Sequence, residues 1–255
     1  MHKKNLLIFT VIFVIIVASG ITAQETIFKD DFELAKIEQW DQEFCCEHSV
    51  DFVTVTENLG QERATYLKFE LRKNDPELNL GKRSELALKS VSLSSLYTYS
   101  FSLFLPRNYE ADRSFEILAQ WHGLPDFELG ETWRSPPLAL RTENGRFKLE
   151  RNWDEEQVTV NSDRQQELID LGAYTPGKLT DWQFQVFWSP QADGSIKVWQ
   201  NNALVWSHQG ANTYNDRQGP YFKIGIYKPD WKYQPEKSSV SNRTVYFDDV
   251  LITNN

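Results

Sequence analysis

Two short segments carry polar side chains at the spacing that a β-strand requires. Gln120 and His122 lie two residues apart in SFEILAQWH, and Arg83 and Glu85 lie two apart in GKRSEL. Successive side chains of a strand point to opposite faces, so residues two apart share a face. If these strands lie in one sheet with those faces turned outward, they form a polar patch with an imidazole, an amide, a guanidinium and a carboxylate.

A third segment, GPYFKIGIYK, has one apolar face and one polar face. Phe222, Ile224 and Ile226 form the apolar face, and the other face carries Tyr221, Lys223, Gly225 and Tyr227. Glycine weakens a strand unless a bulge or a close approach requires it. We expect a sugar ring to lie against Gly225.

Each pair alone is also typical of a solvated strand face. An Arg83–Glu85 pair at the surface would contribute only about 0–1 kcal/mol. A single histidine in a strand is a catalyst in a minority of cases. The combination of all three segments is what favours a site.

The same motifs resemble a known family. KRSEL, QWHG and YFKIGIYKPDW are similar to the motifs of jelly-roll polysaccharide lyases, nearest to the glucuronan lyase and heparin lyase I group. The resemblance runs from FKDDFE, with Trp40, to VYFDDVLI. The jelly-roll alginate lyases have similar motifs, but Trp121 between Gln and His and the KPDW sequence point away from them.

The resemblance implies β-elimination at a 4-linked uronic acid in a polysaccharide. Arg83 and Gln120 would neutralise the sugar carboxylate, Arg83 through a bidentate contact. We expect His122 to be the base that removes the C5 proton and Tyr227 the acid that protonates the leaving oxygen. Alternatively, Tyr227 does both, with a pKa lowered by Lys223, and His122 binds the carboxylate.

Further substrate contacts are expected from five residues: Lys223, Tyr221, Lys228, Glu85 and Trp121. The net charge of −9 makes a nucleic-acid partner improbable. An anionic polysaccharide therefore needs a local cluster of cations, for which Lys82, Arg83, Lys223 and Lys228 are the candidates. Activity should then fall as salt screens them.

Short alternating runs between turn residues predict an all-β fold, a two-sheet antiparallel jelly roll with a concave substrate groove. DRQQELIDLG is expected to be a short helix that ends at Gly172. The connections 123–137, 161–178 and 230–242 are long enough to wall the groove.

Residues 1–23 have the pattern of a secretory signal peptide: a basic start, an apolar run and small residues up to Ala23. Residues 24–255 are expected to form one domain. Loss of Lys3 and Lys4 with the signal lowers the net charge to about −11. We therefore expect a secreted or periplasmic monomer with no membrane association after cleavage.

Two groups of residues suggest other chemistry. Cys45 and Cys46 are adjacent and cannot close a long loop, so we expect them to be buried or partly buried thiols. Asp31, Glu33 and Asp249 are candidate ligands of a structural Ca²⁺ if the first and last strands pair, with Asp30 and Asp248 beside them. Solvated carboxylates explain these acids equally well, and the elimination requires no cofactor.

Two other functions fit a sandwich of this kind. A carbohydrate-binding module would use Trp121, Trp133 and Trp231 as stacking surfaces, and it would keep its affinity after mutation of His122. A glycoside hydrolase needs paired carboxylates that flank the bond, and the sequence has no E-x-D-x-x-E strand. The sequence leaves open which polymer is cut: glucuronan, a glycosaminoglycan, ulvan or alginate.

Overall fold

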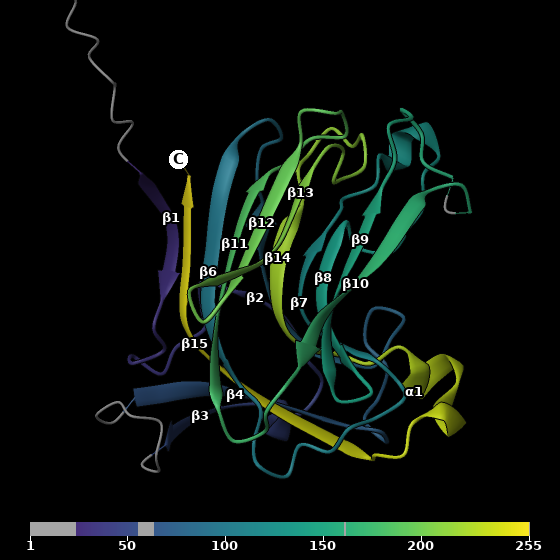
Figure 1. Cartoon of the computed structure of the whole chain (residues 1–255). Helices are drawn as coiled ribbons and strands as arrows, with labels where there is room; N and C mark the ends of the chain where they lie inside the picture. The colour runs from purple at the N-terminus through teal and green to yellow at the C-terminus, as the bar shows by residue number, and fades with distance from the viewer. Residues whose placement is uncertain (1–23, 56–63, 161, 255) are drawn as a thin grey trace, which may run out of the picture.

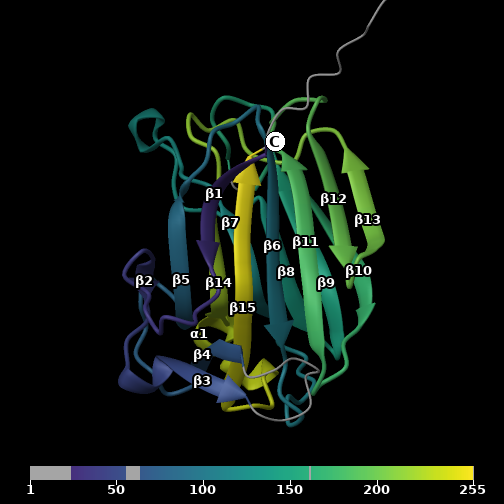
Figure 2. The ribbon, with the colours of Figure 1, turned by 90° about the vertical axis from the view of Figure 1, so that its left-hand side faces the viewer.

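A computed structural model describes residues 24–55, 64–160 and 162–254. The predicted signal peptide lies outside the described residues. Two antiparallel sheets face each other across an apolar interior, as Figure 1 and Figure 2 show. The predicted all-β, two-sheet jelly roll is therefore confirmed.

The first sheet has eight strands. Its order is β13 (Ala203–Gln209), β12 (Ser195–Gln200), β11 (Leu179–Phe187), β6 (Leu96–Phe104), β15 (Asn242–Asn254), β4 (Ala64–Arg72) and β3 (Val50–Val55), with β1 (Glu25–Asp30) also paired to β15. The second sheet has seven strands. Its order is β10 (Gln165–Ala173), β9 (Arg146–Trp153), β8 (Leu138–Glu143), β7 (Glu116–His122), β14 (Tyr221–Tyr227), β5 (Arg83–Ser90) and β2 (Asp41–Glu43).

Helical structure is confined to single turns among the described residues. These are η1 (Glu47–Ser49), η2 (Phe127–Leu129), α1 (Asp230–Tyr233) and η3 (Pro235–Lys237). Within the described part of the chain, none is long and apolar enough to cross a bilayer.

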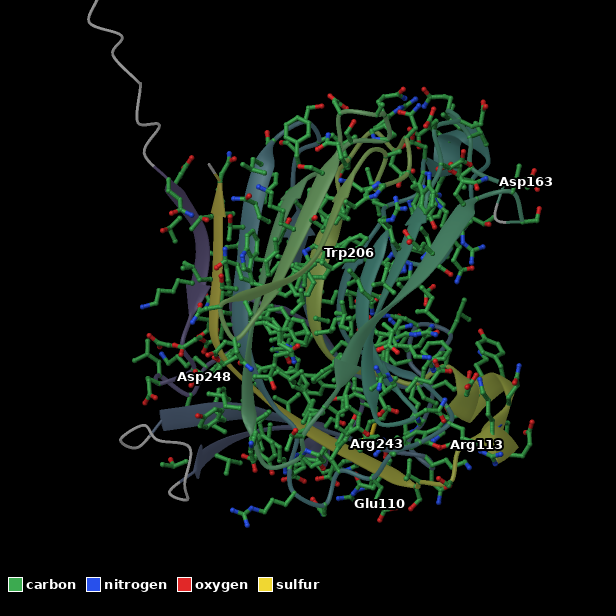
Figure 3. The ribbon with its side chains drawn as sticks, in the orientation of Figure 1. Glu110, Arg113, Asp163, Trp206, Arg243 and Asp248 are labelled. Atoms are coloured by element: carbon green, nitrogen blue, oxygen red, sulfur yellow. A yellow bond between two sulfur atoms is a disulfide. The ribbon has the colours of Figure 1, made fainter. Side chains whose placement is uncertain are left out.

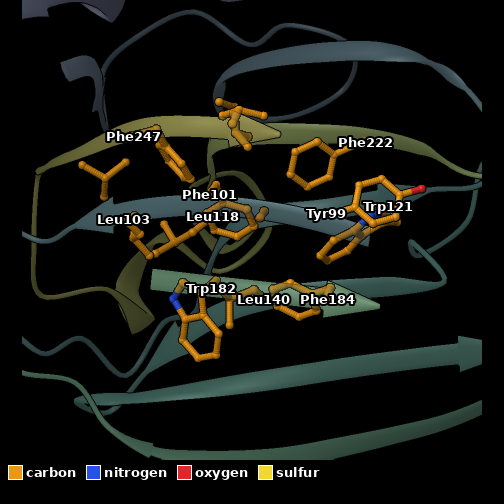
Figure 4. Close-up of a cluster of buried hydrophobic side chains, with 14 of the residues drawn as sticks. Tyr99, Phe101, Leu103, Leu118, Trp121, Leu140, Trp182, Phe184, Phe222 and Phe247 are labelled. Atoms are coloured by element: carbon orange, nitrogen blue, oxygen red, sulfur yellow. The ribbon is translucent and has the colours of Figure 1, made fainter. Parts of the chain in front are cut away.

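Aromatic side chains from both sheets fill the interior (Figure 4). Trp121 is fully buried there, with ring centroids 4.6 Å from Phe184 of the facing sheet and 5.1 Å from Phe222 of the neighbouring strand. The expected contact between Trp121 and substrate is therefore wrong, because its face of β7 packs against the other sheet.

Strand β14 alternates as its sequence predicts, with Phe222, Ile224 and Ile226 all in the core. The structural reason for a glycine at position 225 differs from the one expected. The φ of Gly225 is 132°, and a Cβ atom there would lie 2.2 Å from the carbonyl oxygen of Ser84 on β5. The bulge in β14 and the close approach of β5 require this glycine, without any sugar.

A second bulge changes the alternation in β7. The register to β8 shifts between Ile117 and Ala119, which puts Leu118 in the core and Ile117 on the other face. Strict alternation would place Ile117 in the core and Leu118 on the polar face, and the bulge exchanges them, whereas Gln120 and His122 still share a face.

The helix expected up to Gly172 is instead β10, which pairs with β9. Gly172 has a φ of 105° and sits at a register shift within that strand. Backbone pairing with β9 outweighs the helix propensity of the residues in this segment.

Cys45 and Cys46 form a disulfide in the turn between β2 and η1, so the expectation of two thiols is wrong. Cys45 is exposed and Cys46 is partly buried, so the disulfide lies outside the core.

Candidate active site

A cavity of about 720 Å³ opens on the polar face of the seven-stranded sheet. Its lining comes from seventeen residues: Glu43, Asn79, Leu80, Arg83, Phe115, Ile117, Gln120, His122, Trp133, Arg134, Ser135, Pro136, Glu150, Tyr221, Tyr227, Pro229 and Tyr233. All four residues expected to be catalytic, which are Arg83, Gln120, His122 and Tyr227, are among them.

Three adjacent strands position these groups. Gln120 and His122 come from β7, Tyr221 and Tyr227 from β14, and Arg83 from the first residue of β5. In the sheet register, Tyr221 lies beside His122 and Tyr227 lies beside Arg83. The His122 end and the Tyr227 end therefore form two sides of one cavity.

A hydrogen bond fixes the tautomer of His122, and in this tautomer Nε2 can act as a base. Its Nδ1 lies 2.8 Å from the carbonyl oxygen of Gly123, which can only accept, so Nδ1 carries the proton and donates it. Nε2 then keeps a free lone pair. Burial lowers the pKa of His122 to about 4, and the cations Lys223 and Arg83 act in the same direction. The imidazole is therefore neutral near pH 7.

Tyr221 and Tyr227, two of the three tyrosines that line the cavity, are proton donors at neutral pH. Burial raises the pKa of Tyr227, although the Arg83 guanidinium, 4.5 Å from its ring centroid, opposes the shift. Burial likewise raises the pKa of Tyr221, whose ring centroid is 5.4 Å from that of His122. These raised pKa values keep both phenols protonated. They therefore disfavour the alternative mechanism, in which Tyr227 has a lowered pKa and acts as both base and acid.

A buried carboxylate beneath the cavity joins three donors. Glu85 accepts hydrogen bonds from Gln120 Nε2, from Arg83 Nη1 at 3.2 Å and from Lys223 Nζ at 2.9 Å. Glu85 is buried and, unlike Gln120, does not line the cavity, so it orients these groups and does not contact substrate directly. Its expected role as a substrate contact is therefore replaced by a positioning role.

Glu43 of β2 is a member of the site that the sequence did not reveal. It lines the cavity and accepts hydrogen bonds from Arg83 at 2.9 Å and Lys223 at 2.8 Å. Burial alone would raise the pKa of Glu43, but Lys223 and Arg83 outweigh burial and lower it. Glu43 is therefore an ionised partner of both cations.

Two members of the predicted cluster of substrate-binding cations, Lys223 and Lys228, do not line the cavity, whereas Arg83 does. Lys223 is 1% exposed and lies below the lining between Glu43 and Glu85. Lys228 is fully buried elsewhere, against Glu116 and 2.9 Å from Asp112. Strand alternation gives a side chain's face, but it does not give its depth, and buried lysines require paired carboxylates.

The walls come partly from the expected connections. Trp133 to Pro136 of segment 123–137 form one wall, and Pro229 and Tyr233 contribute to the other. None of the described residues of segment 161–178 lines the cavity, and half of the segment is strand β10. Asn79 and Leu80 complete the second wall, and Leu80 accepts hydrogen bonds through its backbone oxygen from Lys232 and Tyr233.

The acids near the chain ends lie together, since β1 pairs with β15 (Asp248 is labelled in Figure 3). Burial, together with Asp249, Glu33 and Asp31, raises the pKa of Asp248 to about 7. Asp30 turns away and accepts a hydrogen bond from Trp40.

These acids form no ready-made coordination shell. Among the described residues, the one group with three His, Cys, Asp or Glu ligand atoms within 4.8 Å of one another is Cys45, Cys46 and Asp75. Calcium binding at the chain ends would therefore need the carboxylates to move together.

Comparison with protein families identifies the chain. The family model described as "Polysaccharide lyase" matches residues 32–251. The chain belongs to this polysaccharide lyase family. The match covers every strand that lines the cavity. Membership of this family implies a polysaccharide substrate, as the resemblance predicted.

Solved structures share the fold of this polysaccharide lyase. The endo-β-1,4-glucuronan lyase of the fungus Trichoderma reesei is 18% identical, with a TM-score of 0.76 over 90% of this chain and 96% of that one. The family 7 alginate lyase A1-II′ is 16% identical, with a TM-score of 0.56 over 85% and 95%. No curated protein matches the sequence.

Proposed function

We propose that this polysaccharide lyase is secreted and cleaves its polymer at a 4-linked uronic acid by β-elimination. One observation carries the proposal: Arg83, Gln120, His122 and Tyr227 all line a single cavity, although they come from three strands far apart in the sequence. The glucuronan and alginate lyases of similar fold act, by their names, on uronate polymers.

In the proposed reaction, His122 Nε2 takes the C5 proton. The C5–H electron pair forms the C4–C5 double bond, the C4–O bond breaks, and the leaving oxygen takes a proton from a tyrosine. The neutral imidazole and the protonated phenols support these roles, because each group starts in the state that its task needs.

The sugar carboxylate would meet Arg83 and Gln120. Three of the five N–H groups of Arg83 already bond to Glu43, Glu85 and the backbone oxygen of Asn79. The remaining donor on Nη2, with the second amide hydrogen of Gln120, suits one carboxylate. Neutralising it stabilises the carbanion that develops at C5.

Two tyrosines are candidates for the acid, Tyr227 beside Arg83 and Tyr221 beside His122. We propose Tyr227. Tyr227→Phe should then lower kcat by about 10²–10⁴-fold, and Tyr221→Phe should act mainly on KM. The reverse pattern would assign the acid to Tyr221.

Calcium, if bound, is proposed to be structural, at Asp31, Glu33 and Asp249. The raised pKa of Asp248 supports this, because a cation would relieve the repulsion among these carboxylates. Secretion follows from the pattern of residues 1–23, and a monomer remains our prediction.

The test is a panel of uronate polysaccharides, followed by the ultraviolet absorbance of the new double bond. Wild type should produce unsaturated ends on at least one polymer, and His122→Gln should not. New reducing ends without that absorbance would mean hydrolysis and would refute elimination.

A further inference from the structure

The cavity has no surplus of positive charge. Its charged lining residues are two cations, Arg83 and Arg134, and two carboxylates, Glu43 and Glu150. His122, which also lines it, is neutral near pH 7. Among the described residues the lining is therefore electroneutral, in a chain whose net charge is −9.

Each lining cation is also paired with carboxylates. Glu43 and Glu85 together balance Arg83 and Lys223. Arg134 bonds to Asp216 and, at 3.1 Å, to Glu131. The lining carboxylate Glu150 is balanced by Arg141 at 2.6 Å. The cavity therefore provides one place for an added carboxylate, at the spare donors of Arg83 and Gln120.

A homopolymer of uronic acid carries a carboxylate on every sugar. A chain of several such sugars would bring carboxylates next to lining groups that have no free cation to pair with them. Removing an unpaired charge from water is costly, and the acidic protein adds repulsion. A polymer with fewer carboxylates avoids both costs.

The wall beside His122 is aromatic and fixed. Trp133 is 51% exposed, and its ring centroid is 5.6 Å from His122 and 5.2 Å from Phe127. The next residue, Arg134, is anchored in the buried ion pairs, and Glu131 accepts the backbone N–H groups of Asp126 and Thr159 at 2.7 Å. Trp133 is thus a rigid apolar surface at the edge of the cavity, suited to the C–H face of a pyranose ring.

We propose that the substrate is a polymer in which 4-linked uronic acids alternate with neutral sugars. The uronate to be cleaved occupies the donors of Arg83 and Gln120, and a neutral neighbour stacks on Trp133. The inference rests on the proposed elimination and adds the charge pattern of the polymer.

The test compares two hexasaccharides that share the cleaved sugar. One contains only 4-linked glucuronate, and the other alternates 4-linked glucuronate with N-acetylglucosamine. We expect kcat/KM to be at least about tenfold higher for the alternating compound than for the homopolymer fragment. This ratio corresponds to about 1.4 kcal/mol, which we assign to one carboxylate without a cation partner. Added salt should raise kcat/KM for the homopolymer fragment, because it screens repulsion.

Trp133→Ala should raise KM for the alternating hexasaccharide about tenfold with little change in kcat. Trp206→Ala is the matched control, since Trp206 is a partly exposed tryptophan on β13, outside the cavity lining (Figure 3). Equal or faster cleavage of the homopolymer fragment, or an unchanged KM in Trp133→Ala, overturns this inference and leaves the lyase assignment standing. Absence of unsaturated product from both compounds overturns this inference and counts against the proposed elimination.

Discussion

The protonation of His122 should appear in two independent measurements. Its pKa in the folded protein is about 4, against 6.5 for the ordinary side chain. Because the neutral imidazole is the proposed base, kcat/KM should be flat between pH 5 and 7 with respect to this group and fall only near pH 4. An unperturbed histidine would give that fall near pH 6.5.

The same shift is a statement about stability. Between about pH 6.5 and pH 4 the unfolded chain binds a proton at His122 that the folded chain does not bind. The free energy of unfolding therefore decreases as pH falls through this window, by up to about 3 kcal/mol for a pKa lowered from 6.5 to about 4.

His122→Gln isolates both effects, since glutamine does not titrate and can still donate to the Gly123 carbonyl. The variant should lose about 10²–10⁴-fold in kcat. Urea unfolding of both proteins at pH 7 and pH 4.5 should show the wild type losing more stability than the variant. An activity limb at pH 6–7, or an equal loss of stability in both proteins, would refute the assigned pKa and the neutral-base argument.

Three further changes test other parts of the structure. Glu85→Gln keeps the shape of the buried acceptor but removes its charge. We expect kcat/KM to fall about 100-fold and the free energy of unfolding to drop by roughly 1.5–3 kcal/mol. An unchanged kcat/KM would show that Glu85 does not position the donors. Calcium should raise the Tm of wild type but not of Asp249→Asn, and equal shifts would exclude the proposed ligands. Reduction of Cys45–Cys46 by a dithiol should change urea stability by less than about 1 kcal/mol, because the bond closes almost no loop; a large loss would contradict this.

Strand periodicity predicted much of the site. The shared faces of Arg83 with Glu85 and of Gln120 with His122 follow from a period of two, and no bulge falls between the members of either pair. The apolar face of β14 followed in the same way. Alternation failed at Ile117, because a bulge adds a residue that a sequence pattern does not mark.

Depth and long-range partners could not be predicted from the sequence. Lysine is usually a surface residue, yet Lys223 and Lys228 are buried because carboxylates far away in the sequence pair with them. Glu43 lies 40 residues before Arg83, its partner, on a strand of three residues. No local spacing connects them, so only the folded sheet reveals the neutral charge of the cavity.

The antiparallel pairing of β1 with β15 has a consequence for the architecture of larger proteins built on this fold. Glu25 is the register partner of Asn254, so both ends of the described chain lie side by side at one end of the eight-stranded sheet. The cavity belongs to the other sheet. A module fused to either end would therefore start from the same place, and a long polymer would still have access to the groove.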